Sequence, residues 1–363
     1  MFTTGFHRRV IAGALAGVAA LALQVRPASA QGCVASRLEA PPMDTPGESA
    51  EPGKWEVSLS WRTYRSDRHF VGHEEQVNRA TEHSQVINRI NQPEISITRN
   101  YQHGWRFSVG IPYLLAERSS PIRDPNTNVV VDRSETGAKG LGDVTFVGRK
   151  WLWDPAGGHQ GNISLGFGAK IPTGDNNDVD TRASISSTGA MTLTERTVDQ
   201  SIQPGDGGFG IILDLQMYMR FAGNRLAAYA NGTYLANPQR DSGIRTYRNA
   251  PGEEVMSIAD QYIARTGIAW YPGSGWGASL GLRAEGVPVY DLIGSSEGFR
   301  RPGYSISVEP GASWTRGAHT FSLQAPIAVD RARLVSVADR ANGSHGDAAF
   351  ADFLVVGGYT RRF

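Results

Sequence analysis

The segment NISLGFGAKI, from Asn162 to Ile171, decides the fold. Its larger apolar side chains fall on every second residue, and small or polar residues fall between them. This period-two alternation predicts a β-strand with one apolar face and one polar face. The same pattern recurs on both sides of the segment, at residues 55–62, 105–113, 209–218 and 321–329. We therefore predict an all-β protein.

The gaps between the predicted strands alternate in length along the chain. The short gaps are residues 101–104, 221–224, 272–275 and 314–318, with a longer one at residues 154–161. The long gaps are residues 66–84, 118–140, 173–207, 236–257, 288–302 and 330–347. Tight turns at one rim and long loops at the other are typical of an outer-membrane barrel with strands of about 10 residues. The predicted fold is a transmembrane up-and-down antiparallel β-barrel of about twelve strands.

A soluble β-sandwich gives the same alternation, with the apolar face turned inward. Three features favour the membrane, and the first is the alternation of gap lengths between the two rims. Aromatic residues gather near the strand ends, as in an interfacial girdle. The polar face also carries charges within the strands. We predict that this face lines a lumen and that the pore-lining residues are Arg62, Arg106, Asp143, Arg149, Lys170, Asp214, Arg225, Arg265, Arg283, Glu285 and Glu309.

The first thirty residues have the pattern of a secretory signal peptide. His7, Arg8 and Arg9 precede an apolar, Ala-rich run, and residues 28–30 fit a small-residue cleavage site. The run is shorter than the ~20 apolar residues of a membrane helix. We predict a signal peptide at residues 1–30, a disordered periplasmic leader at residues 31–53 and the barrel at residues 54–363. Cys33, the only cysteine, is either lipidated or an incidental thiol of the leader.

Composition excludes one class of partner, and the predicted barrel indicates others. The chain has 36 Lys and Arg against 35 Asp and Glu, so it lacks the basic excess that nucleic-acid binding needs. A barrel of this kind has outer-membrane lipids as its surroundings and a small-molecule solute in its lumen. The terminal Phe363 resembles the signal read by the bacterial outer-membrane insertion machinery, which we expect as a third partner. The expected localisation is the bacterial outer membrane.

Other motifs give weak indications of chemistry. Gly277 to Gly281 matches G-x-S-x-G, but it lies within a predicted strand, whereas a catalytic elbow needs a strand-to-helix turn. The acidic residues between Asp175 and Asp180 either bind a cation or are solvated turn residues. His69, His73 and His83 lie in a loop without a predicted helix. We predict no enzyme activity, no cofactor and no metal site.

Three short motifs indicate a family. They are Gly140 to Val144 (GLGDV), Lys170 to Asp175 (KIPTGD) and Gln203 to Gly208 (QPGDGG), and VGIPY precedes them at Val109 to Tyr113. In this order the motifs resemble the outer-membrane barrels named after the meta-pathway of phenol degradation. The resemblance implies a transporter for hydrophobic or aromatic compounds and supplies no binding residues.

The residues themselves predict a narrow, charged lumen. A twelve-strand barrel is wider than an eight-strand barrel, which its side chains nearly fill, and narrower than a 16-strand porin. Arginines facing Asp214, Glu285 and Glu309 either align a solute or form a static network that stiffens the barrel. The loop at residues 173–207 either folds into the lumen or stays at the surface. A channel or transporter is the favoured function, and the alternative is a structural or adhesive barrel without transport.

Overall fold

The structure is a computed structural model, and it describes residues 53–363. Twelve antiparallel strands form one sheet, which closes because the last strand pairs with the first, for example at Glu56 and Arg362. This confirms the predicted all-β barrel and its number of strands. The predicted signal peptide at residues 1–30 and the leader as far as residue 52, with Cys33, lie outside the described residues.

Ten of the twelve barrel strands are continuous or nearly so. They are β1 (Trp55–Val71), β3 (Ile87–Asn100), β4 (Trp105–Arg123), β7 (Gly161–Ile171), β10 (Gly210–Phe221), β11 (Leu226–Ala236), β14 (Gln261–Gly273), β15 (Trp276–Val287), β16 (Gly303–Arg316) and β19 (Ala348–Arg362). The other two barrel strands are each divided into two segments. They are β5 (Val130–Leu141) with β6 (Val144–Trp151), and β17 (His319–Gln324) with β18 (Ile327–Arg333).

The two divisions have local causes. Between β5 and β6, Gly142 and Asp143 add one residue relative to β4, which is a β-bulge. Between β17 and β18, Pro326 has no N–H to donate to a neighbouring strand. The sequence predicted one uninterrupted strand through residues 321–329, and the break at Pro326 corrects that prediction.

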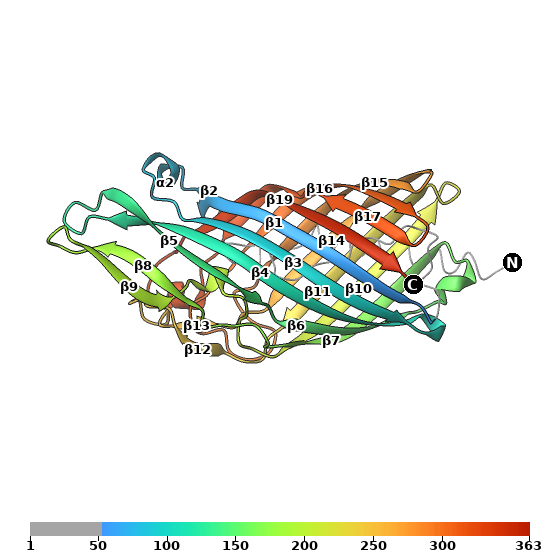
Figure 1. Cartoon of the computed structure of the whole chain (residues 1–363), viewed down its shortest axis with the longest axis horizontal. Coiled ribbons are helices and arrows are strands. Elements are labelled where there is room, and N and C mark those ends of the chain that lie inside the picture. The colour runs from blue at the N-terminus through green and yellow to red at the C-terminus, as the bar shows by residue number, and fades with distance from the viewer. Residues whose placement is uncertain (1–52) are drawn as a thin grey trace.

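The two rims differ as predicted. Short turns join the strands at one rim, where 3₁₀ turns form at η1 (Gln102–Gly104) and η2 (Pro155–Gly157). The C-terminus lies at this rim, and the long connections extend from the other (Figure 1). Those connections carry the remaining elements, which are β2 (Glu74–Glu75), α2 (Asn78–Thr81), β8 (Val179–Ile185), β9 (Met191–Thr197), η3 (Gln200–Ile202), β12 (Asp241–Arg245), β13 (Val255–Ser257) and α3 (Val337–Ala341).

The predicted loop at residues 118–140 is mostly strand. β4 and β5 continue as a paired hairpin as far as Arg123 and Val130, so only residues 124–129 form the turn. The prediction was wrong because this hairpin extends beyond the apolar part of the barrel. Without a lipid-facing side, its residues do not alternate between apolar and polar.

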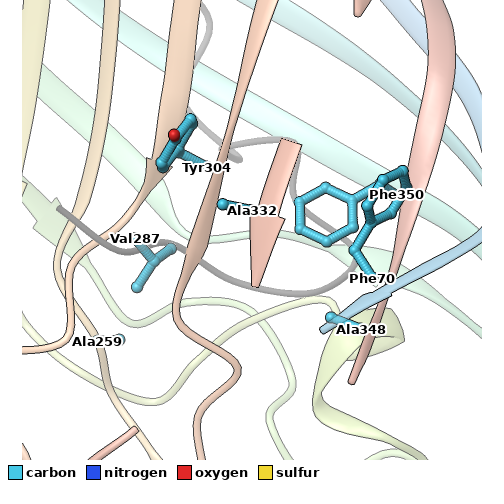
Figure 2. Packing of buried hydrophobic residues seen from close by; sticks show 7 residues of the cluster. All are labelled: Phe70, Ala259, Val287, Tyr304, Ala332, Ala348 and Phe350. Atoms are coloured by element: carbon cyan, nitrogen blue, oxygen red, sulfur yellow. The ribbon is translucent and has the colours of Figure 1, made fainter. Parts of the chain in front are cut away.

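An apolar cluster closes the barrel wall near the long-loop rim. β18 and β19 share only the backbone pair Ile327 and Phe353. Between this pair and the long-loop rim, the two strands are not paired with each other. The cluster lies in this region, with the rings of Phe70 and Phe350 packed edge to face at 5.5 Å between centroids (Figure 2). Ala332 and Tyr304 belong to the same cluster. Side-chain packing here supplements the backbone, since the end of β18 pairs through Arg333 with Gly72, which follows β1.

Candidate functional site: the barrel lumen

The two faces of the barrel wall are chemically opposite. Alternate residues on the outer face are exposed and apolar, as at Leu165, Phe167, Leu213, Ile268 and Leu280. Their neighbours on the inner face are polar and buried, and Ser164 and Asp214 are examples. An exposed apolar band around a closed barrel is the surface that lipid solvates. The lumen is therefore the place where buried chemistry is concentrated.

The lumen holds an ionic network that joins three neighbouring strands to a fourth strand that does not pair with them. Arg62 of β1 donates from Nη2 to Glu285 Oε2 of β15 at 3.1 Å. Arg283, two residues before Glu285, donates to the same oxygen at 2.8 Å. β1 and β15 are not adjacent in the sheet, so this contact crosses the lumen.

Glu309 of β16 extends the network. It accepts from Arg265 Nε of β14 at 2.7 Å and pairs with Arg283 Nη1 at 3.4 Å. The five charged residues are each at most 5% exposed. Three guanidinium groups thus face two carboxylates, and these five side chains carry one positive charge in excess.

Two further ion pairs lie on the inner wall. Arg106 of β4 pairs with Glu56 of β1 at 2.8 Å, and Arg149 Nε of β6 pairs with Asp214 Oδ1 of β10 at 2.7 Å. The second pair spans β7 at Gly166, where a Cβ would lie 2.9 Å from the Cβ of Asp214. The glycine lets the two side chains meet across the strand between them.

An apolar layer lies next to the polar one on the same four strands. Val147, Ile212, Leu235 and Ile263 form a buried cluster on the inner wall. Each is two residues from a polar side chain, respectively Arg149, Asp214, Thr233 and Arg265, on the side of the short turns. A solute moving from the long loops toward the short turns would pass the apolar layer first and the charged layer second.

The three motifs that resemble the phenol-pathway barrels converge at one point. Lys170 is ion-paired with Asp206 and lies 3.7 Å from Asp143 Oδ2. The carboxylate of Asp143 accepts from the backbone N–H groups of Gly174 and Asp206 at 3.0 and 3.1 Å. Asp143 therefore holds both ends of the 173–207 loop against the wall, and this is a structural role.

Part of that loop folds into the lumen. Val198 and the fully buried Ile202 of η3 pack on Ile90, Leu114 and Ala116, which belong to the inner faces of β3 and β4. Gln200 Nε2 donates to the carbonyl oxygen of Ser257, on a different part of the rim. This settles the alternative that the sequence left open for residues 173–207. The β8–β9 hairpin of the same loop extends outward (Figure 1).

Asp199 anchors the inserted segment. Its carboxylate accepts two hydrogen bonds from Arg301, at 2.8 and 2.6 Å, and lies 3.3 Å from Arg118 Nη2 of β4. Burial raises the pKa of Asp199, but the two guanidinium groups outweigh burial and hold the pKa well below its ordinary value. The residue is therefore a carboxylate at neutral pH.

The predicted site residues are placed unequally. Ten of them belong to the ion pairs described above, whereas Arg225 is exposed in the turn between β10 and β11. It lies at the rim because β11 begins one residue later, at Leu226. That the other ten residues line a pathway and contact a solute remains a prediction.

Four charged residues of these ion pairs were not among the predicted lumen residues: Glu56, Arg118, Asp199 and Arg301. Glu56 alternates with Trp55 and Val57, so the period-two pattern was sufficient to place it on the lumen face. The other three fell in predicted loops, where no periodicity indicates a facing.

Among residues 53–363, no three His, Cys, Asp or Glu side chains gather so as to hold a metal ion. No helix in this range is long and apolar enough to cross a membrane. The G-x-S-x-G run lies inside β15, without the elbow that a nucleophilic serine needs.

Comparison with known proteins supports the fold. No family model and no curated protein matches the chain. Among solved structures, an outer-membrane channel from Pseudomonas putida F1 is similar with a TM-score of 0.56 at 12% identity, over 90% of this chain and 100% of that one. The Pseudomonas putida toluene transporter TodX gives a TM-score of 0.44 at 10% identity, over 92% and 96%.

The fold and its two faces define the class of protein. A closed twelve-strand barrel with an apolar exterior and a charged interior is an outer-membrane β-barrel protein. None of these comparisons matches the phenol-pathway family, so that assignment remains a prediction.

Proposed function

We propose that the protein is an outer-membrane channel for small molecules, which pass through the narrow charged lumen. The main observation that supports this proposal is a buried ionic network in the lumen. It consists of Arg62, Arg265, Arg283, Glu285 and Glu309. Burying ion pairs costs desolvation, and well-packed apolar residues of similar volume often serve stability as well or better. Stability alone is therefore a weak reason for the network, and its charged side chains support a pathway in which polar groups of a solute meet the wall.

The solute class that we propose is hydrophobic or aromatic small molecules. Two observations support it: the apolar layer at Val147, Ile212, Leu235 and Ile263, and the resemblance of the three motifs to phenol-pathway barrels. One solved structure with a similar fold, from Pseudomonas putida F1, is itself an outer-membrane channel.

Ion selectivity in planar bilayers tests the proposal. Charged groups lining a pore set its ion preference. Arg265→Gln should shift the reversal potential toward cations, and Glu309→Gln should shift it toward anions. Arg225→Gln, at the exposed rim, is the matched control and should have little effect. Asp199→Asn should loosen the inserted loop. If neither the wild type nor Asp199→Asn conducts ions in planar bilayers, the structural or adhesive alternative is supported.

A further inference from the structure

The inserted loop segment presents two chemical groups to the lumen wall. One is the carboxylate of Asp199, and the other is the pair of aliphatic side chains of Val198 and Ile202. Together they have the composition of an apolar organic acid. The wall supplies a complementary partner for each group.

The carboxylate is bound by side chains from two separate places. Arg118 comes from β4 and Arg301 from the connection before β16, which lies on another part of the barrel. Arg301 presents both terminal nitrogens, at 2.8 and 2.6 Å from the two oxygens of Asp199. This paired geometry is how arginine recognises a planar carboxylate.

The aliphatic side chains are bound by an apolar surface of the inner wall. Ile90, Leu114, Ala116 and Ala138 form it, and each is at most 7% exposed. Val198 is 3% exposed and Ile202 is fully buried. If the loop segment left, this surface would be exposed beside two arginines.

We propose that Arg118, Arg301 and this apolar surface form a binding site for the carboxylate and hydrocarbon of an apolar organic acid, and that residues 198–202 occupy the site when no ligand is present. The inference rests on the proposed channel function and names its solute class. Solute binding then displaces the segment and opens the pathway. Beyond the segment, the solute meets the same sequence of surfaces again, an apolar layer followed by arginines.

Thiol labelling measures displacement of the segment directly. Ile202→Cys in a Cys33→Ser background, reconstituted in lipid nanodiscs, should react slowly with a maleimide because residue 202 is buried. Octanoate should accelerate labelling by about tenfold or more, since a ligand shifts the equilibrium toward the state that binds it. Acetate, an anion without a tail, and octanol, a tail without an anion, should not. Ser187→Cys, exposed in the same loop, is the matched control and should react alike under all conditions.

Further variants test the role of the anchor. In the Ile202→Cys background, Asp199→Asn and Arg301→Gln should each give rapid labelling without octanoate. Calorimetric titration of the unaltered protein is an independent readout, with heat of binding expected for octanoate and none for acetate. Equal acceleration by octanol and octanoate, or no binding of octanoate to the unaltered protein, would overturn the site.

The labelling result and the channel result can fail separately. Octanoate-dependent labelling without conductance would preserve the site and reject the channel. Conductance with ion selectivity but no octanoate-dependent labelling would preserve the channel and reject the site.

Discussion

Arg62 of β1 and Glu285 of β15 meet across the lumen at 3.1 Å, although they are 223 residues apart in the chain. Both are almost completely buried, at 1% and 3% exposure. The contact joins two walls of the barrel that share no backbone pairing. This ion pair therefore links two separate parts of the barrel wall, and its two side chains also place charge in the lumen.

Glu285→Gln tests that ion pair. The change removes the carboxylate that Arg62 and Arg283 share, so two buried guanidinium groups lose an ionic partner. Removing one partner of a buried ion pair costs about 3–5 kcal/mol. Urea unfolding in lipid vesicles should show a loss of this size. The double variant Arg62→Met with Glu285→Leu should regain much of it, and a double variant as unstable as Glu285→Gln would contradict the explanation.

The lipid-facing surface can be tested with matched leucines. Leu165 on β7 and Leu193 on β9 are both exposed, at 55% and 70%, but only Leu165 lies on the barrel wall. Arginine at the bilayer midplane of a barrel costs about 2–4 kcal/mol. Leu165→Arg should therefore impair folding into vesicles, whereas Leu193→Arg should have little effect. Equal losses would show that β7 does not face lipid as described.

The barrel wall was predictable from the sequence because each strand has lipid on one side and polar side chains on the other. Period-two alternation then fixes the facing of residues such as Leu165 and Ser164 without any knowledge of the neighbours. The same rule failed where lipid is absent, as in the hairpin that ends at Arg123 and Val130.

The partners of the lumen charges could not be predicted in the same way. Facing alone placed Arg62 and Glu285 in the lumen, but their contact depends on how the strands are staggered around the closed barrel. The insertion of Ile202 and Asp199 depends on contacts with β3, β4 and residue 301, which are remote in the chain. No local pattern contains that information.

Two glycines in the family-like motifs approach each other too closely to carry side chains. A Cβ on Gly205 would lie 2.5 Å from the carbonyl oxygen of Gly174, and a Cβ on Gly174 would lie 2.8 Å from Gly205 Cα. Gly205→Ala should destabilise the barrel by about 1–3 kcal/mol, because overpacking forces the backbone apart. Gly357→Ala is the control, since open space surrounds that position. Urea unfolding of the two variants should separate them, and equal stabilities would refute the close contact.

The inserted loop should resist mild acid. The pKa of Asp199 is held well below 3.8, so its carboxylate contributes stability that is present above that value and is lost only as pH falls through the lower pKa of the folded state. Between about pH 7 and about pH 5 the anchor stays ionised, and single-channel opening attributed to this loop should not change. The contradicting result has two parts: the wild-type channel begins to open near pH 5, and the Asp199→Asn channel is already open at pH 7. Together they would show that the pKa of Asp199 is much higher than the structure indicates.

The C-terminal residue closes the seam between the last strand and the first. The N–H of Phe363 donates to the carbonyl oxygen of Trp55 at 2.9 Å, its ring is exposed, and the Arg361 guanidinium lies 4.6 Å from the ring centroid. We expect the insertion machinery to read this terminal aromatic, so deleting Phe363 should lower the amount of heat-modifiable protein in outer membranes. Arg361→Tyr should assemble at least as well as the wild type, since the long arginine stem is tolerated at the interface only by reaching the headgroups. Refolding of the purified deletion variant into vesicles distinguishes the causes: normal refolding with poor assembly in cells identifies lost recognition, whereas poor refolding identifies a weakened seam.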